Sequence, residues 1–213
     1  MALSDPFDFL PDFAAIGWVT SFDLMYRQEQ SRTAGGRTLV KDLGSPLWQL
    51  KAQSKPLRPN ELDKWRARLA AMENGFATFY GYSLSRTYPI AYPKGSWPTG
   101  GAFSGTTATL SSVNANRKAG RVDDLPAGFK LSVGDYISVE GDLHQVMEDA
   151  TASGAGLTPE FEVRPHFWPG VSSGAVSVFR PSCIMAIVPG SISSDAGLNG
   201  WGSVAFQALE ARE

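Results

Sequence analysis

Residues that could support acid–base chemistry lie close together in the second half of the sequence. Asp142 precedes His144 by two positions on a segment that alternates apolar and polar residues, and Asp135 lies upstream. An imidazole beside a carboxylate can act as a general base near neutral pH, and a serine could complete such a site. A lone histidine on a strand is more often structural, so we expect no catalytic role for His144.

A pair of carboxylates is the other arrangement with chemical potential. Glu160 and Glu162 are two residues apart, which places them on one face of a strand. Two facing carboxylates are the groups that glycoside hydrolysis requires. Acids exposed on strands are usually only solvated, so a hydrolase that attacks cell-wall polymer through His144 or Glu162 is the third and weakest hypothesis.

The composition leaves little material for a metal or nucleotide site. The 213 residues include two histidines and one cysteine, whereas a zinc site needs about four such ligands. The segment Gly170-Val171-Ser172-Ser173-Gly174 has the Gly-x-Ser-x-Gly spacing, but a strand-like segment and no helix follows it, so it is not a nucleophile elbow. The glycine-rich run 95–101 lacks the lysine of a phosphate-binding loop. Cys183 lies in an apolar run and is expected to be a small buried side chain. We therefore expect no catalytic, cofactor-binding or metal-binding residue, no cofactor and no enzymatic activity.

Aromatic residues are the better candidates for contacts. The chain has six tryptophans, of which Trp18, Trp48 and Trp65 lie in periodic apolar patterns and are expected in the core. Trp97 and Trp168 are flanked by proline and glycine, which is typical of loops. We interpret these two as subunit or ligand contacts. A carbohydrate-binding module that uses them is the alternative from another functional class.

The elements that position these residues are mostly strands. One α-helix is predicted over residues 60–73, because Leu62, Trp65 and Leu69 recur at helical spacing. A hairpin is predicted where Gly141 and Asp142 separate two alternating segments. The sequence thus predicts a mainly β protein with one clear α-helix.

The chain is expected to contain two β-rich units. Residues 1–93 would form a β-sandwich-like unit with the helix, and residues 94–128 a loop or linker with a possible short strand. Residues 129–213 would form a second unit, a sandwich or a barrel, because strands recur there with turns between them.

Charge is unevenly distributed along the sequence. Residues 1–106 carry 12 basic and 9 acidic residues, a net charge of +3. Residues 107–213 carry 7 basic and 12 acidic residues, a net charge of −5, so the whole chain has a net charge of −2. The basic excess begins at Arg27 and includes Arg37, both candidate subunit or ligand contacts. It could be only a solvated face. If opposite charges form two patches, they favour contacts between different surfaces of neighbouring copies, and such contacts can close into rings.

The N-terminal segment has no basic residue before Pro11, and the longest apolar stretch, Ile184 to Val188, is too short to span a bilayer. We therefore expect a protein made in the cytoplasm with no membrane contact. Its near-neutral charge gives no indication of sequence-specific nucleic-acid binding.

Several short segments together resemble tail-tip proteins of tailed bacteriophages, from about residue 15 to 210. The segments that carry the resemblance are Met25-Tyr26-Arg27, Gly35-Gly36-Arg37, Asp42-Leu43-Gly44, Leu47-Trp48, the helix with Trp65 and Leu69, Asn74-Gly75-Phe76-Ala77-Thr78-Phe79, residues 131–139, Leu143-His144-Gln145-Val146, Val163-Arg164-Pro165 and residues 206–210. This identifies the chain as similar to distal tail or baseplate proteins.

The resemblance implies a structural virion protein, assembled in the host cytoplasm and located in the tail. It would form a homohexameric ring of β-sandwich-like domains between the tail tube protein and the tail-tip hub protein, with DNA passing through the lumen. Some relatives carry a carbohydrate-binding insertion, but no large insertion is evident in this sequence. A tail terminator or a head–tail connector ring is the alternative within the same class. No catalytic residue is implied.

Overall fold

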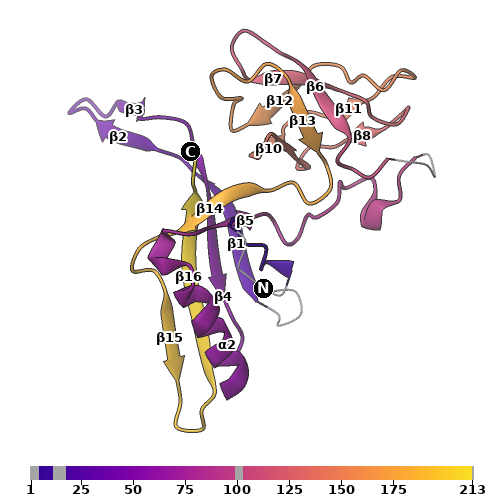
Figure 1. Cartoon of the computed structure of the whole chain (residues 1–213). Coiled ribbons are helices and arrows are strands. Elements are labelled where there is room, and N and C mark those ends of the chain that lie inside the picture. The colour runs from indigo at the N-terminus through magenta and orange to yellow at the C-terminus, as the bar shows by residue number, and fades with distance from the viewer. Residues whose placement is uncertain (1–4, 12–17, 99–102, 213) are drawn as a thin grey trace. The chain divides into compact units, whose positions relative to one another are not determined.

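The computed structural model of the chain describes residues 5–11, 18–98 and 103–212. The predicted mainly β fold with one α-helix is confirmed for these residues, which form a β-sheet unit with a helix and a closed barrel (Figure 1). The chain divides into two compact units: unit 1 comprises residues 1–81 and 184–213, and unit 2 comprises residues 82–183.

Unit 1 is built on an antiparallel sheet whose strands come from both ends of the chain. Its main path runs β1-β4-β16-β14-β5, and β15 pairs with one end of β16. The strands are β1 (Val19–Met25), β4 (Leu47–Gln53), β5 (Thr78–Gly81), β14 (Cys183–Ile187), β15 (Ser193–Ala196) and β16 (Gly202–Glu210).

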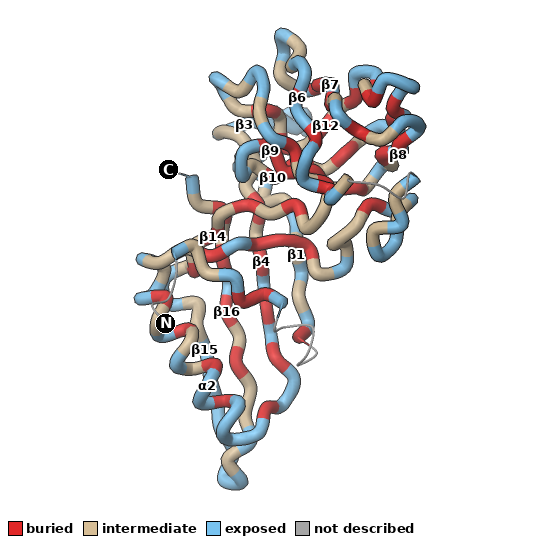
Figure 2. Tube along the Cα trace, turned by 45° about the vertical axis from the view of Figure 1, so that its right-hand side comes forward, coloured by how far each residue is buried: buried red, intermediate tan, exposed pale blue. Residues whose placement is uncertain are grey.

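One face of this sheet forms the core of unit 1. Along β4, Trp48, Leu50 and Ala52 are buried, whereas Lys51 and Gln53 between and beyond them are exposed. The same alternation along β16 is visible beside it (Figure 2). Such a period of two is expected for a sheet that is covered on one face only. The opposite face of β1, β4 and β16 presents polar side chains such as Ser21, Lys51 and Gln207.

Helix α2 (Pro59–Ala70) covers the buried face. Its apolar side presents Leu62, Trp65 and Leu69, as the spacing predicted. The Trp65 ring lies 4.9 Å from that of Trp18, which lies 5.9 Å from Phe206 of β16. The helix ends before the predicted residue 73, because Glu73 and Asn74 have positive φ angles and form the short 3₁₀ turn η1 (Glu73–Gly75).

A two-stranded arm extends from the β1–β4 pair. It consists of β2 (Gln28–Arg32) and β3 (Thr38–Asp42), which pair only with each other among the described strands. The turn at Ala34–Gly36 lies at its tip, where Gly36 has a φ of +81°. All ten strand residues of the arm are exposed.

Unit 2 is a closed barrel in the order β10-β12-β7-β6-β13-β9. Its strands are β6 (Ala108–Val113), β7 (Ala119–Asp123), β9 (Tyr136–Val139), β10 (Asp142–Val146), β12 (Phe161–Arg164) and β13 (Gly174–Ser177). The predicted hairpin at Gly141 is present as β9 and β10. Outside the barrel, β8 (Lys130–Leu131) pairs with β11 (Ala150–Thr151), and η2 (Pro93–Gly95) is a 3₁₀ turn.

The boundaries of the units differ from the predicted 1–93, 94–128 and 129–213. The segment expected to be a linker contains β6 and β7, whose buried Ala108, Leu110 and Val122 face the barrel core. Residues 184–213 belong to unit 1, because β16 pairs with β4. Unit 2 therefore interrupts the sequence of unit 1, although no large insertion was expected.

Candidate functional site

His144, the candidate general base, is a structural residue of the barrel. It is 1% exposed, and its ring lies 4.7 Å from the ring of Phe167 in the barrel core. Its Nδ1 lies 2.8 Å from the carbonyl oxygen of Pro165. A carbonyl only accepts hydrogen bonds, so Nδ1 carries the proton and donates it to that bond. This arrangement holds the imidazole in one orientation inside the barrel.

Asp135, proposed as a partner of His144, instead fixes the backbone. Its carboxylate accepts hydrogen bonds from the N–H groups of Ile90 and Ser132, both at 2.7 Å. Burial raises the pKa of Asp135, and the nearby charge of Asp149 adds to this rise. The two backbone hydrogen bonds and the charge of Arg86 lower the pKa and partly offset the effect of burial. The carboxylate thus joins the segment around Ile90 to a barrel turn.

The carboxylate pair also has a structural setting. Glu162 on β12 accepts a hydrogen bond from the Arg164 guanidinium at 2.7 Å, and this contact lowers the pKa of Glu162. A carboxyl that remains ionised is a poor general acid, because glycosidase acids need a raised pKa. Glu160 is exposed and precedes the strand. The Arg164 contact therefore shifts the pKa of Glu162 in the direction opposite to that of a glycosidase general acid.

In the described parts of the chain, no three His, Cys, Asp or Glu side chains group together as metal ligands. Cys183 is buried, as predicted. No helix among the described residues is long and apolar enough to cross a membrane.

The two candidate contact tryptophans are half-buried in unit 2. The Trp97 ring lies 5.2 Å from that of Phe103 and 5.9 Å from that of Phe129, and it packs against the barrel core. Trp168 follows the buried Phe167. Part of the glycine-rich run, residues 99–101, lies outside the described residues. Trp97 therefore closes the barrel core on one side and leaves only part of its ring for a ligand.

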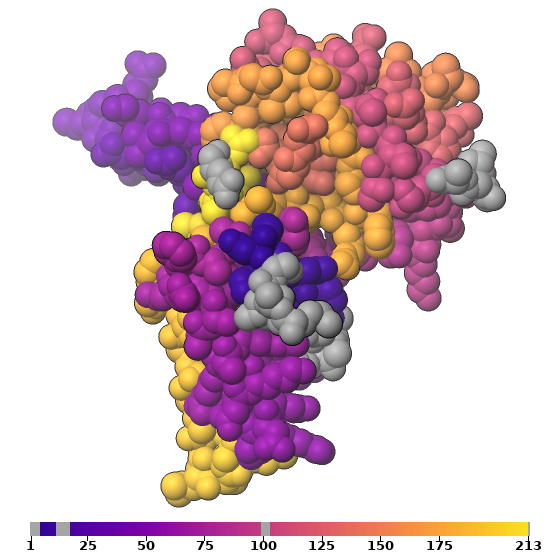
Figure 3. All heavy atoms as spheres, viewed as in Figure 1, coloured from indigo at the N-terminus to yellow at the C-terminus, as the bar shows by residue number. Residues whose placement is uncertain are grey.

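The arm carries both candidate arginines. Arg27 lies at its base, where its carbonyl accepts a hydrogen bond from Leu43 at 2.8 Å. Arg37 lies next to the tip, where its backbone N–H donates to Thr33 Oγ1 at 3.1 Å. Both side chains are exposed, and so are Leu39 and Val40, at 49% and 60%. The arm forms a narrow projection in the space-filling view (Figure 3).

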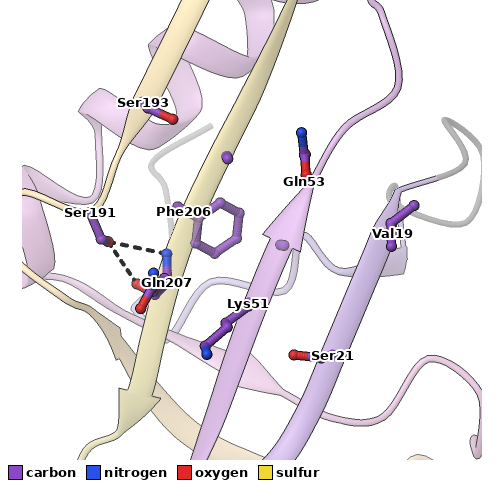
Figure 4. A pocket seen from close by; sticks show the side chains of 10 residues that line it. Val19, Ser21, Lys51, Gln53, Ser191, Ser193, Phe206 and Gln207 are labelled. Carbon is purple, nitrogen blue, oxygen red and sulfur yellow. Dashed lines mark hydrogen bonds between the residues drawn. The ribbon is translucent and has the colours of Figure 1, made fainter.

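A groove of about 350 Å³ crosses the polar face of the unit 1 sheet. It is lined by Val19, Ser21, Lys51, Ala52, Gln53, Ser191, Ser193, Ala205, Phe206 and Gln207. Lys51 on β4 lies between Ser21 on β1 and Gln207 on β16 (Figure 4). One wall is held by Ser191, whose hydroxyl donates to the Gln207 carbonyl at 3.0 Å and accepts from its N–H at 3.1 Å. Its residues come from distant segments, so the sequence did not indicate it.

The charge bias of the two sequence halves does not separate the two structural units. Unit 1 contains 11 basic and 12 acidic residues, and unit 2 contains 8 and 9. The bias disappears for two reasons. Residues 184–213, with three acidic residues and one basic residue, belong to unit 1, and Arg86 and Lys94 belong to unit 2.

Comparison of the sequence with known proteins does not identify a family for this chain. No protein-family model matches the sequence, and no curated protein matches it significantly.

Proposed function

We propose that this chain is a structural virion protein that forms a ring at the distal end of a phage tail, joining the tail tube to the tail-tip hub. The arm is the observation that carries the proposal, and the resemblance of the sequence to tail-tip proteins supplies the type of assembly. The proposal assigns no reaction to the chain.

The arm supports self-assembly because its own unit does little to stabilise it. A two-stranded hairpin is marginally stable alone in water, and this one exposes every strand residue. Neither outer edge pairs with another of the described strands, and Leu39 and Val40 add exposed apolar surface. Such an arm gains stability when another chain covers it, and repeated contacts between different surfaces close into rings.

In this ring each copy contacts two neighbours, and six copies are expected by resemblance. The tail tube protein and the hub protein are the other partners. DNA passes through the lumen without sequence-specific recognition. A tail terminator or head–tail connector uses the same kind of ring at another place, so position along the tail separates these alternatives.

The arm is tested by sedimentation velocity on the full chain. We expect the wild type to form a closed ring and the double variant L39S/V40S to dissociate toward monomer at the same concentration. Val133, 56% exposed in unit 2, provides the control for Val40→Ser alone, because Val133→Ser makes the same replacement at a similarly exposed valine outside the arm. A wild-type chain that remains monomeric with tube protein present would contradict the proposal.

Position is tested by gold labelling of the C-terminus in tailed particles that carry this chain. Label at the distal end of the tail supports the proposed function. Label at the head-proximal end supports the terminator or connector instead, and unlabelled tails contradict both.

A further inference from the structure

A protruding turn of unit 1 displays an aromatic side chain. Glu73, Asn74 and Gly75 have consecutive positive φ angles of 47°, 57° and 100°. Immediately after them, Phe76 is 85% exposed. Left-handed backbone is unfavourable for residues other than glycine and is retained mainly where a fixed geometry has a use. We call residues 73–76 the Phe76 turn.

The Phe76 turn is held in place by the segment that follows β14. The Asn74 side-chain oxygen accepts a hydrogen bond from the Gly190 N–H at 3.1 Å. Gly75 packs so closely on the chain that a Cβ there would lie 2.2 Å from the Ile187 carbonyl oxygen. Phe76 is therefore presented from a fixed support, which lowers the entropy cost of docking it into a partner.

The groove on the same unit has the complementary chemistry. Its rim includes Val19, which is 67% exposed, and Ala205 adds apolar surface on β16. Lys51 is the single charged residue among those that line it. The groove thus offers the exposed apolar side chain of Val19 and one positive charge among mostly uncharged polar side chains, whereas the Phe76 turn offers an exposed phenyl group beside the exposed Glu73.

We propose that the Phe76 turn of one copy docks in the groove of a second copy, with Phe76 against Val19 and Glu73 opposite Lys51. The opposite charges of Glu73 and Lys51 favour this occupant. A buried aromatic side chain beside such a charge pair is a typical centre of binding energy in an interface. Turn and groove are different surfaces, so the contact is heterologous and can repeat around a ring. The inference rests on the proposed function and names one contact that builds the ring.

Charge reversal tests the pairing in the full chain. We expect Glu73→Lys and Lys51→Glu each to raise the dissociation constant of self-association about tenfold, within the range for contacting residues, and the double variant to restore most of the affinity. The rescue should weaken as salt rises, since the pair lies near solvent. Sedimentation velocity at several concentrations measures all four chains. Single variants that associate normally, or a double variant without rescue, overturn the inference.

A second series tests the aromatic anchor. Phe76→Ala should also weaken self-association about tenfold or more. Leu198→Ala is the matched control, because Leu198 is fully exposed on another turn of unit 1 and should leave association unchanged. These side chains are exposed, so urea unfolding midpoints should not change. If the ring depends on Leu39 and Val40 but not on Phe76, the proposed function stands and this contact is wrong. If the wild type never associates, both fail.

Discussion

The backbone N–H of Trp48 donates a hydrogen bond to the Glu210 carboxylate at 3.1 Å, across a sequence separation of 162 residues. Both residues are buried. The bond joins the start of β4 to the end of β16, the two neighbouring central strands of unit 1. It therefore links the two sequence segments between which unit 2 is inserted.

Removing this carboxylate should destabilise unit 1. We expect Glu210→Ala to lower the free energy of unfolding by about 1–3 kcal/mol, because the buried N–H of Trp48 loses its acceptor. Glu210→Gln keeps an oxygen acceptor and should cost clearly less. Urea unfolding followed by tryptophan fluorescence measures both. Equal losses in the two variants would show that the hydrogen bond does not set the stability.

Replacing His144 should destabilise the barrel without affecting unit 1. His144→Phe keeps an aromatic ring near Phe167 but leaves the Pro165 carbonyl without this donor, at a cost of about 1–3 kcal/mol. His144→Ala should cost more, because it also leaves a cavity. Hydrogen exchange of barrel amides resolves the effect by unit. A barrel that is as stable as the wild type in both variants would contradict the structural role of His144.

The pKa of Asp135 makes barrel stability depend on pH. Because burial raises this pKa above its ordinary value of 3.8, the folded state binds the proton more tightly than the unfolded state. This group's contribution to stability is therefore fully present below pH 3.8 and is lost as the pH rises through the folded pKa. Asp135→Asn lacks this titration, so the stability difference, wild type minus variant, should fall with rising pH. Urea titrations at several pH values measure it, and a difference that rises with pH would contradict the assignment.

Unit 2 should fold when separated from unit 1. Residues 82–183 contain a closed barrel with its own buried core, and a barrel leaves no edge strand that needs a partner. We expect the excised segment to unfold cooperatively on heating and to give dispersed amide NMR signals. A segment without a cooperative transition would show that the barrel depends on unit 1.

Local sequence patterns predicted the helix and the strands better than they predicted which strands pair with one another. Leu62, Trp65 and Leu69 gave helical periodicity, and Gly141 with Asp142 marked the β9–β10 turn, because these signals lie within a few residues. For residues 94–128 the sequence predicts a loop or linker with a possible short strand, because the start is rich in glycine and proline and residues 114–128 are mostly polar. Leu110 and Val122, which face the barrel core, are sparse in this segment. Short-range patterning cannot weigh such sparse buried positions.

Long-range pairing was the part that the sequence could not supply. Nothing local to β4 indicates that its neighbour is β16, so unit 1 was expected to end near residue 93. The groove and the contact between Asn74 and Gly190 depend on that pairing and were missed with it. For His144, the alternating strand placed it on one face, but only the fold shows that this face is buried.

The central position of β16 has a consequence for synthesis. The ribosome produces β1 and β4 well before β16, and at about 5–20 residues per second the delay is on the order of ten seconds. During this interval unit 2 can fold, while β4 lacks its central neighbour. The groove, which needs Ala205 and Gln207, cannot exist until then. Any contact made through this groove, including the docking that we propose, can therefore form only after translation has reached β16.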